Sequence, residues 1–300
     1  MSDNFPQGWV RDDEAVEAVQ ASLPFPVAGD TPAGQVEDIP DHVYLWDVAR
    51  VVNGGLIPPR NQGQVGSCVS FGTARAVEYS MCAEIAVGEP ESFMDLCTEV
   101  IYAGSRVEIG GGRLRGDGSV GAWAADWCRK YGILGRLEYK TEKATYDLRQ
   151  YSEARCKSWG STGVPNDLEP LAKVHPIRQT TQVKTWEEAK RMLASGYGIA
   201  VCSGQGFSMK RDANGVAKAS GSWAHCMCLC GYHTEGGKEF GRIDNSWGAS
   251  AHTGPTGWGN PGPEGFWAEA SVISKMLAEK DSWAFSSVDG FPVKKLRWII

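Results

Sequence analysis

The stretch Asn61-Gln62-Gly63-Gln64-Val65-Gly66-Ser67-Cys68-Val69-Ser70-Phe71 is the most informative part of the chain. Apolar residues follow it at roughly helical spacing as far as Ile85, which predicts a helix that Ser67 caps and Cys68 opens. The positive end of the helix dipole favours a thiolate there, so Cys68 is a candidate nucleophile. Gln62 precedes it on a glycine turn, where its amide and the Cys68 N–H can converge on one oxygen as an oxyanion hole.

Two later segments strengthen this hypothesis. Ser222-Trp223-Ala224-His225-Cys226 enters a predicted strand, and Asp244-Asn245-Ser246-Trp247-Gly248 follows another, with Gly257-Trp258-Gly259 beyond it. Taken singly, the cysteine is more often a small core residue, the histidine structural and the asparagine a turn residue. Their occurrence together in one chain favours catalysis.

In this order, Gln62, Cys68, His225 and the segment from Asn245 to Gly248 resemble the papain-like cysteine peptidases. The resemblance extends over about residues 42–290. It implies an α+β fold of two lobes, with a helical N-terminal lobe and an antiparallel, β-barrel-like C-terminal lobe. The active site is then expected in the cleft between them.

The resemblance also implies the catalytic roles. Cys68 is expected to attack the scissile carbonyl, and His225 to protonate the leaving amine. Asn245 is expected to orient the imidazole, while Gln62 and the Cys68 N–H hold the oxyanion.

Three further residues are implied as parts of the substrate site. Gly118 and Ser119 belong to a segment that resembles the edge of the family's cleft, where a glycine lets substrate backbone approach as an added strand. Trp247 is expected to screen the hydrogen bond of the catalytic histidine from water. The substrate is then a polypeptide, and neither a metal nor an organic cofactor is expected.

Departures from the family pattern are few. Val69 stands where an aromatic residue is usual, and Ala224 where a polar one is, but neither change removes a reacting atom. Val65 and Gly116 replace two cysteines that form a bridge in many members, which fits a reducing environment. Cys226, Cys228 and Cys230 alternate along one strand at a spacing that suits core packing better than zinc.

Composition excludes other classes of protein. The 300 residues carry a formal charge of −6 without a long basic block, so nucleic acid is a poor partner. We find no run of about 18 apolar residues and no signal-peptide pattern at the start, so a membrane-spanning or exported chain is not expected. The nine cysteines, an odd number, suit a reducing compartment. A cytoplasmic location is therefore predicted, and association with a virus particle stays open.

The chain divides into an arm and a domain. Residues 1–41, rich in proline beyond a short helix near 13–23, are expected to form an extended arm on the surface. This arm is too short for the family's usual inhibitory leader, although it can still lie in or near the cleft. Residues 42–300 form the predicted peptidase domain, with helices in 42–148 and mainly strands in 149–300.

Local patterns predict individual elements. We expect a strand at 43–46 and helices at about 93–105 and 122–131, the last of them ended by Gly132. Another helix begins at the capping box of Thr185 and Glu188. Strands are expected from 175 onward and at 198–202, 226–232, 240–244 and 265–267.

Other functions remain open at this point. The same residues suit a catalytically idle module that binds peptides or belongs to an assembly, and they also suit isopeptide, peptidoglycan amide or transfer chemistry. The run from His252 to Pro261 resembles an insertion. We expect it to form a solvated loop, or to shape the leaving-group side of the cleft.

Overall fold

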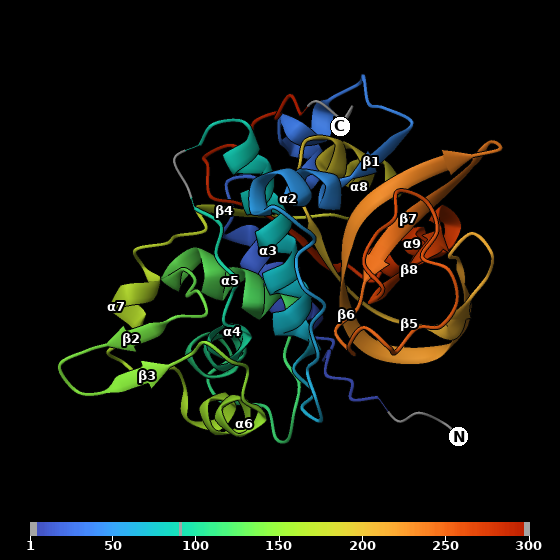
Figure 1. Ribbon diagram of the computed structural model, residues 1–300. Helices are drawn as coiled ribbons and strands as arrows, with labels where there is room; N and C mark the ends of the chain where they lie inside the picture. Colours follow the sequence, from blue (N-terminus) through green and yellow to red (C-terminus); the bar gives the residue numbers. More distant parts are fainter. Residues whose placement is uncertain (1–4, 90–91, 297–300) are drawn as a thin grey trace.

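Most of the helices lie on one side of the molecule and most of the main sheet on the other. Residues 5–89 and 92–296 are described in a computed structural model of the chain, in which α3 to α7 lie on one side and β5 to β8 on the other (Figure 1). The α-helices are α1 (Asp13–Ala21), α2 (Leu45–Asn53), α3 (Cys68–Ala86), α4 (Thr98–Gly104), α5 (Gly121–Tyr131), α6 (Glu153–Thr162), α7 (Glu169–Ala172), α8 (Trp186–Ala194) and α9 (Ala270–Leu277). Two 3-10 helices, η1 (Ala28–Asp30) and η2 (Ala33–Gln35), and a π-helix, η3 (Ser105–Ile109), complete them.

The main sheet is antiparallel. Its strands are β1 (His42–Tyr44), β4 (Gln179–Gln182), β5 (Ile199–Arg211), β6 (Ala217–Glu235), β7 (Lys238–Asp244), β8 (Gly265–Glu269) and β9 (Asp281–Ser286), while β2 (Glu138–Lys140) and β3 (Thr145–Asp147) form a separate hairpin. The order is β4-β9-β5-β6-β7-β8, with β1 added on β6. The α+β fold is therefore confirmed. The sheet is open and not a closed barrel, because β4 and β8 end the path among the described residues.

Helix α3 is the central element. Its residues are buried from Cys68 to Glu84, because α2, α4 and α5 pack against it on one side and β5, β6 and β9 on the other (Figure 1). A helix covered on all sides belongs to the core. Its buried Glu78 forms ion pairs with Arg60 and Arg75. This packing fixes the position of Cys68 at the start of the helix.

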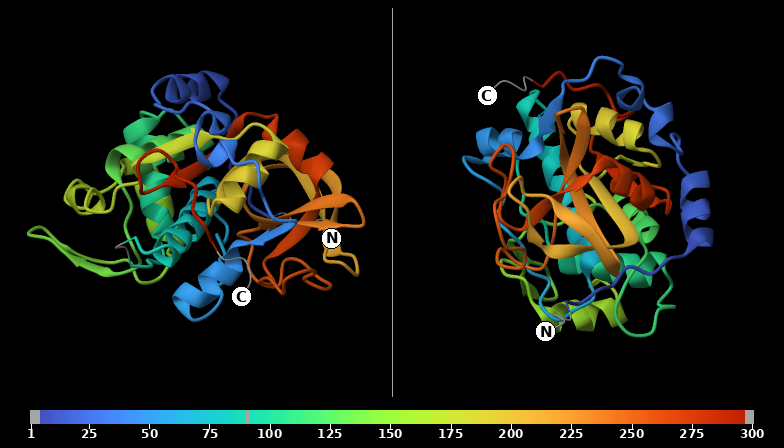
Figure 2. Two further views of the ribbon diagram at one scale, coloured as in Figure 1. Left: turned by 90° about the horizontal axis from the view of Figure 1, so that it is seen from above. Right: turned by 90° about the vertical axis from the view of Figure 1, so that its right-hand side faces the viewer.

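The N-terminal arm is more than a surface segment. The predicted short helix is α1, which packs against α5, and Val16, Val19 and Leu23 are buried in the core. The right-hand view of Figure 2 shows the arm in dark blue along one edge of the molecule. Apolar residues on one face of α1 therefore join the main core, while the opposite face of the helix is exposed.

Several elements differ from the expected ones. Strand β1 ends at Tyr44, and Leu45 and Trp46 open helix α2. The helix expected at 93–105 starts at Thr98 and continues as a π-helix to Ile109. Helices α6, α7 and α9 were not predicted, and α6 packs against α4 although it follows residue 149. Gly160 and polar residues weaken the periodic signal of α6, while α7 and α9, at four and eight residues, are too short to show a clear period.

Candidate active site

Cys68 lies at the first position of α3 and is fully buried. Ser67 precedes the helix as expected, but its side chain makes no capping hydrogen bond. Burial raises the pKa of the Cys68 thiol, and backbone hydrogen bonds from Cys226 and Gly8 oppose only part of this shift. The expected thiolate is therefore not the favoured form here, because loss of solvent outweighs the helix dipole.

His225 lies in β6 and is held by Asn245. The Nε2 of His225 is 2.8 Å from the Oδ1 of Asn245, and both residues are buried. Burial lowers the pKa of His225 to about 4, although the hydrogen bond with Asn245 opposes this shift. Its Nδ1 has no hydrogen-bond partner within residues 5–89 and 92–296. The ring is therefore neutral, with one nitrogen oriented by Asn245 and the other unoccupied.

A second histidine, His252, holds the far side of Asn245. The Nδ2 of Asn245 donates to the Nε2 of His252 over 3.1 Å, and the Ser246 N–H donates to the Oδ1 of Asn245. Burial, followed by the charges of Arg211 and Arg242, lowers the pKa of His252 to about 3. A neutral His252 accepts through Nε2, and this contact directs the oxygen of Asn245 toward His225.

His252 itself does not belong to a solvated loop, although residues 253–260 after it are exposed or half-buried. Only 3% of this residue is exposed, and its ring packs on Phe266 at 4.8 Å. The neighbouring backbone is tied to β5, because the Thr253 N–H donates to the Met209 carbonyl and the Arg211 N–H to the Thr253 carbonyl. No local pattern points to this role, since histidines in glycine-rich loops are commonly exposed.

Gln62 connects the nucleophile loop to the asparagine segment. Its N–H donates to the Ser246 carbonyl over 2.8 Å, and its Oε1 accepts from the Ser246 hydroxyl over 2.6 Å. Its Nε2 donates to the carbonyls of Val65 and Pro6. The structure therefore brings the loop that carries Gln62, ahead of Cys68, against the segment that follows Asn245.

Trp247 covers His225. The two rings stack with centroids 4.3 Å apart, and Phe5 stacks on Trp247 at 4.7 Å. The indole N–H of Trp247 donates to the Pro6 carbonyl over 3.1 Å. The position of Trp247 over the histidine agrees with the expected screening of its hydrogen bond from water.

The N-terminal arm lies against the residues expected to bind substrate. The Ser119 N–H donates to the Gly8 carbonyl over 2.8 Å, and the Val10 N–H to the Ser119 carbonyl over 2.9 Å. Across the cleft, the N–H groups of Gly8 and Trp9 both donate to the Ala224 carbonyl. The arm therefore joins the two sides of the cleft at the predicted site.

Gly118 has the conformation that this contact requires. Its φ of +111° is one that L side chains rarely adopt, and a Cβ there would lie 2.9 Å from the Gly8 oxygen. In the structure the backbone that lies against this glycine is that of the arm. Whether a substrate takes the same place stays a prediction.

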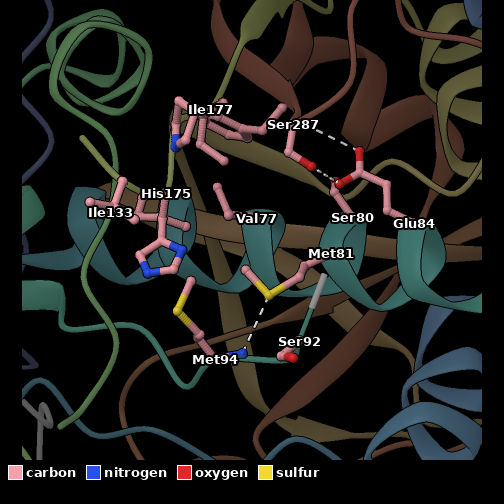
Figure 3. A pocket seen from close by; sticks show the side chains of 13 residues that line it. Val77, Ser80, Met81, Glu84, Ser92, Met94, Ile133, His175, Ile177 and Ser287 are labelled. Atoms are coloured by element: carbon pink, nitrogen blue, oxygen red, sulfur yellow. Dashed lines mark hydrogen bonds between the residues drawn. The ribbon is translucent and has the colours of Figure 1, made fainter. Parts of the chain in front are cut away.

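The three cysteines of β6 and a separate cavity lie in or beside the core. Cys226, Cys228 and Cys230 are buried, and all nine cysteines are free. A cavity of about 350 Å³ lies along α3, with Met81, Met94 and His175 around it and Glu84 bonded to Ser287 at one end (Figure 3). None of the predicted site residues lines this cavity.

Among the described helices, none is both long and apolar enough to cross a bilayer.

Comparison with known proteins agrees with this geometry. The model of the papain family cysteine proteases matches residues 45–261. Cysteine proteinases 1 and 2 of Entamoeba histolytica are each 25% identical to the chain over 212 residues, which is 70% of this chain and 59% of each relative. The chain thus matches less than two thirds of their length.

Solved structures share the fold. Xylellain, a cysteine protease from Xylella fastidiosa, has a TM-score of 0.58 at 17% identity, with 96% of this chain and 94% of that chain covered. Digestive procathepsin L 3 of Tenebrio molitor has a TM-score of 0.54 at 14% identity, with 91% and 78% covered. At these identities the likeness concerns the architecture alone.

Proposed function

Because the chain belongs to the papain family of cysteine proteases, we propose that it is a cysteine endopeptidase that acts through Cys68 and His225. The observation that carries this proposal is the hydrogen-bonded chain from His252 through Asn245 to His225. It leaves the Nδ1 of His225 unoccupied, and the backbone of the next residue contacts Cys68. An imidazole that an amide orients through one nitrogen, with its second nitrogen free, is suited to act as the general base of a nearby thiol.

The reaction follows from these positions. The Nδ1 of His225 takes the thiol proton of Cys68, and the sulfur attacks the scissile carbonyl carbon. Gln62 Nε2 and the Cys68 N–H stabilise the oxyanion. When the intermediate collapses, the imidazolium gives its proton to the leaving amine and a thioester remains. Water, deprotonated by His225, then attacks the thioester and restores the thiol.

The arm runs through the cleft in the opposite direction to a substrate. The leaving half of a substrate is its C-terminal half and lies beside the proton donor His225, on the side of Trp247. In the arm, that side holds the earlier residue Pro6, while the later residue Val10 pairs with Ser119. A carbonyl of the reversed chain is not presented to Cys68 as in a substrate, so the arm is an inhibitor of the site and not its substrate.

The finer assignments belong to the same proposal. The substrate is a polypeptide, and the nine free thiols favour a reducing compartment such as the cytoplasm. Occupation of the cleft by the arm also suits a module that only binds peptides. The unoccupied Nδ1 of an oriented histidine favours the enzyme, because binding alone does not use it.

Alkylation separates the two functions. The test uses the full chain with Gly8→Val, a change that weakens the contact of the arm with the cleft. This variant is treated with iodoacetamide near pH 6 and analysed by intact mass and peptide mapping. We expect selective labelling of Cys68 among the nine cysteines, slowed at least tenfold by His225→Ala, and cleavage of a peptide library that Cys68→Ala abolishes. Equal labelling of all accessible cysteines would favour the binding module. Selective labelling of Cys68 without peptide cleavage would favour transfer chemistry.

Replacement of His252 tests the orientation of Asn245. In the same background we expect His252→Phe, which keeps a ring on Phe266 but removes the acceptor, to slow the labelling of Cys68 by about five- to tenfold. His252→Gln supplies an amide oxygen as acceptor and is expected to restore most of the rate. Equal losses in both variants, or a fall in thermal stability that accounts for the loss, would contradict an orienting role.

A further inference from the structure

The side chain of Trp9 fills a pocket beside the proposed nucleophile. Only 7% of Trp9 is exposed, and its indole N–H donates to the Oδ2 of Asp281 over 2.8 Å. Its backbone is held by the Ala224 carbonyl, and the next residue pairs with Ser119. The pocket therefore lies on the side of the cleft away from Trp247, which is the acyl side of the proposed reaction.

Asp281 forms the floor of this pocket. It opens β9, is 1% exposed and pairs with Cys202 of β5. Besides Trp9, its carboxylate accepts from the Gly121 N–H at the start of α5 over 2.8 Å and from the indole N–H of Trp283 over 2.7 Å. The floor is thus a rigid acceptor shared by the helical side and the sheet.

Close contact with Gly121 and two hydrogen bonds hold the carboxylate of Asp281 in place. A Cβ on Gly121 would lie 2.7 Å from Asp281 Oδ1, so the carboxylate is already in tight contact with α5. When the arm leaves, Asp281 keeps its bonds from Gly121 and Trp283 and loses the one from Trp9. The opened pocket then has the volume of an indole and a carboxylate that has lost one of its donors.

We propose, on the basis of the peptidase function above, that Asp281 makes this pocket selective for an acyl-side substrate residue whose large side chain carries an N–H donor, tryptophan above all. An apolar side chain of the same size would fill the pocket but would not donate to Asp281. The buried carboxylate would then have one hydrogen bond fewer. Sites with buried polar groups reject ligands that leave those groups unpaired, whereas they distinguish apolar ligands only weakly by size. Trp9 shows which chemistry the pocket accepts, even though the direction of its chain is reversed.

The test compares two side chains of nearly equal shape. Peptidyl epoxides that carry tryptophan or 2-naphthylalanine at each acyl-side position in turn react with the full chain bearing Gly8→Val, and the rate of Cys68 labelling is divided by the rate with iodoacetamide. We expect tryptophan to be preferred at one position by at least tenfold, as a hydrogen bond to a charged group predicts. Epoxides that carry arginine at the same positions show whether the pocket also accepts a basic N–H donor.

Variants at the floor of the pocket give the control. Asp281→Leu is expected to abolish the preference for tryptophan over naphthylalanine, and Asp281→Asn, which keeps a carbonyl oxygen for α5, to retain part of it. Asp289→Asn, at an exposed carboxylate paired with Arg178, should leave the preference unchanged. Thermal unfolding and the iodoacetamide rate show whether each variant is folded.

The outcomes are distinct. Equal rates for tryptophan and naphthylalanine at every position, with normal iodoacetamide labelling of Cys68, would overturn the selectivity and leave the proposed peptidase intact. A preference that survives Asp281→Leu in a folded protein would assign it to another residue. Absence of selective labelling by iodoacetamide would instead overturn the proposed function, and the inference with it.

Discussion

Gly8→Val is expected to raise the rate at which iodoacetamide labels Cys68 in the full chain by about 100-fold. A Cβ on Gly8 would lie 1.8 Å from the Gly66 carbonyl oxygen, a backbone atom of the loop that precedes Cys68. Neither partner is the end of a flexible side chain, so the contact is relieved only if the arm moves away. Overpacking of this kind costs about 3 kcal/mol, which corresponds to about 100-fold in the population of the open cleft.

The expected gain depends on how much of the site the arm covers. The arm contributes backbone hydrogen bonds to Ala224 and Ser119, and Pro6 accepts from Gln62 and Trp247. Trp9 is the largest buried side chain of the arm and also donates to Asp281. Trp9→Ala is therefore expected to accelerate labelling at least as much as Gly8→Val, by about 100-fold or more.

A matched control distinguishes opening of the cleft from general loosening. Gly55 lies outside the arm and a Cβ there meets no atom within 4 Å, so Gly55→Val should leave the rate unchanged. Intact mass and peptide mapping follow Cys68 against the eight other cysteines. If Gly8→Val labels all cysteines faster in parallel with lower thermal stability, the arm does not control access to the site.

The sequence predicted the parts of the site that local patterns encode. Gln62 and Cys68 lie in one loop-to-helix segment, and Asn245 and Trp247 follow one strand, so each segment could be recognised without knowledge of the fold. His252 and Asp281 could not be found in this way. Trp9 and Asp281 are 272 positions apart, and their contact arises only when the arm crosses the cleft.

Protonation states were also beyond the reach of the sequence. A cysteine at the start of a helix predicts a thiolate, and this holds where solvent reaches the sulfur. In this chain the arm, Trp247 and β6 exclude solvent from both reacting groups. The site is therefore assembled in its uncharged form, with the thiol of Cys68 and the imidazole of His225 both neutral.

Acid is expected to open the cleft of the unmodified chain. In the closed state the pKa of His225 is about 4, and in an open cleft it returns toward its ordinary value of about 6.5. Between these values the open state binds more protons, so a fall in pH favours opening. The two pKa values predict an increase of about 40-fold in the opening equilibrium between pH 6.5 and 4.5 from this residue.

Three other titratable groups around the cleft determine how far this pH dependence holds for the whole chain. His252, beyond Asn245, has a pKa of about 3 and stays neutral throughout. Burial raises the pKa of Asp281 under Trp9, so protonation of Asp281 in the closed state opposes opening. The pKa of Cys68 is raised by burial, and its thiol keeps its proton in this range. The increase from His225 is therefore an upper bound for the whole chain.

Hydrogen exchange measures the opening directly. The amide hydrogens of Gly8, Trp9 and Val10 are bonded to carbonyls across the cleft, so their protection reports the closed state. After correction for intrinsic rates, protection of residues 8–10 should fall as the pH is lowered from 6.5 to 4.5. His225→Phe should remove this dependence, whereas His233→Phe, at a partly buried histidine farther along β6, should retain it. Protection that is constant with pH, or that falls equally in His225→Phe, would show that His225 does not couple acid to the arm.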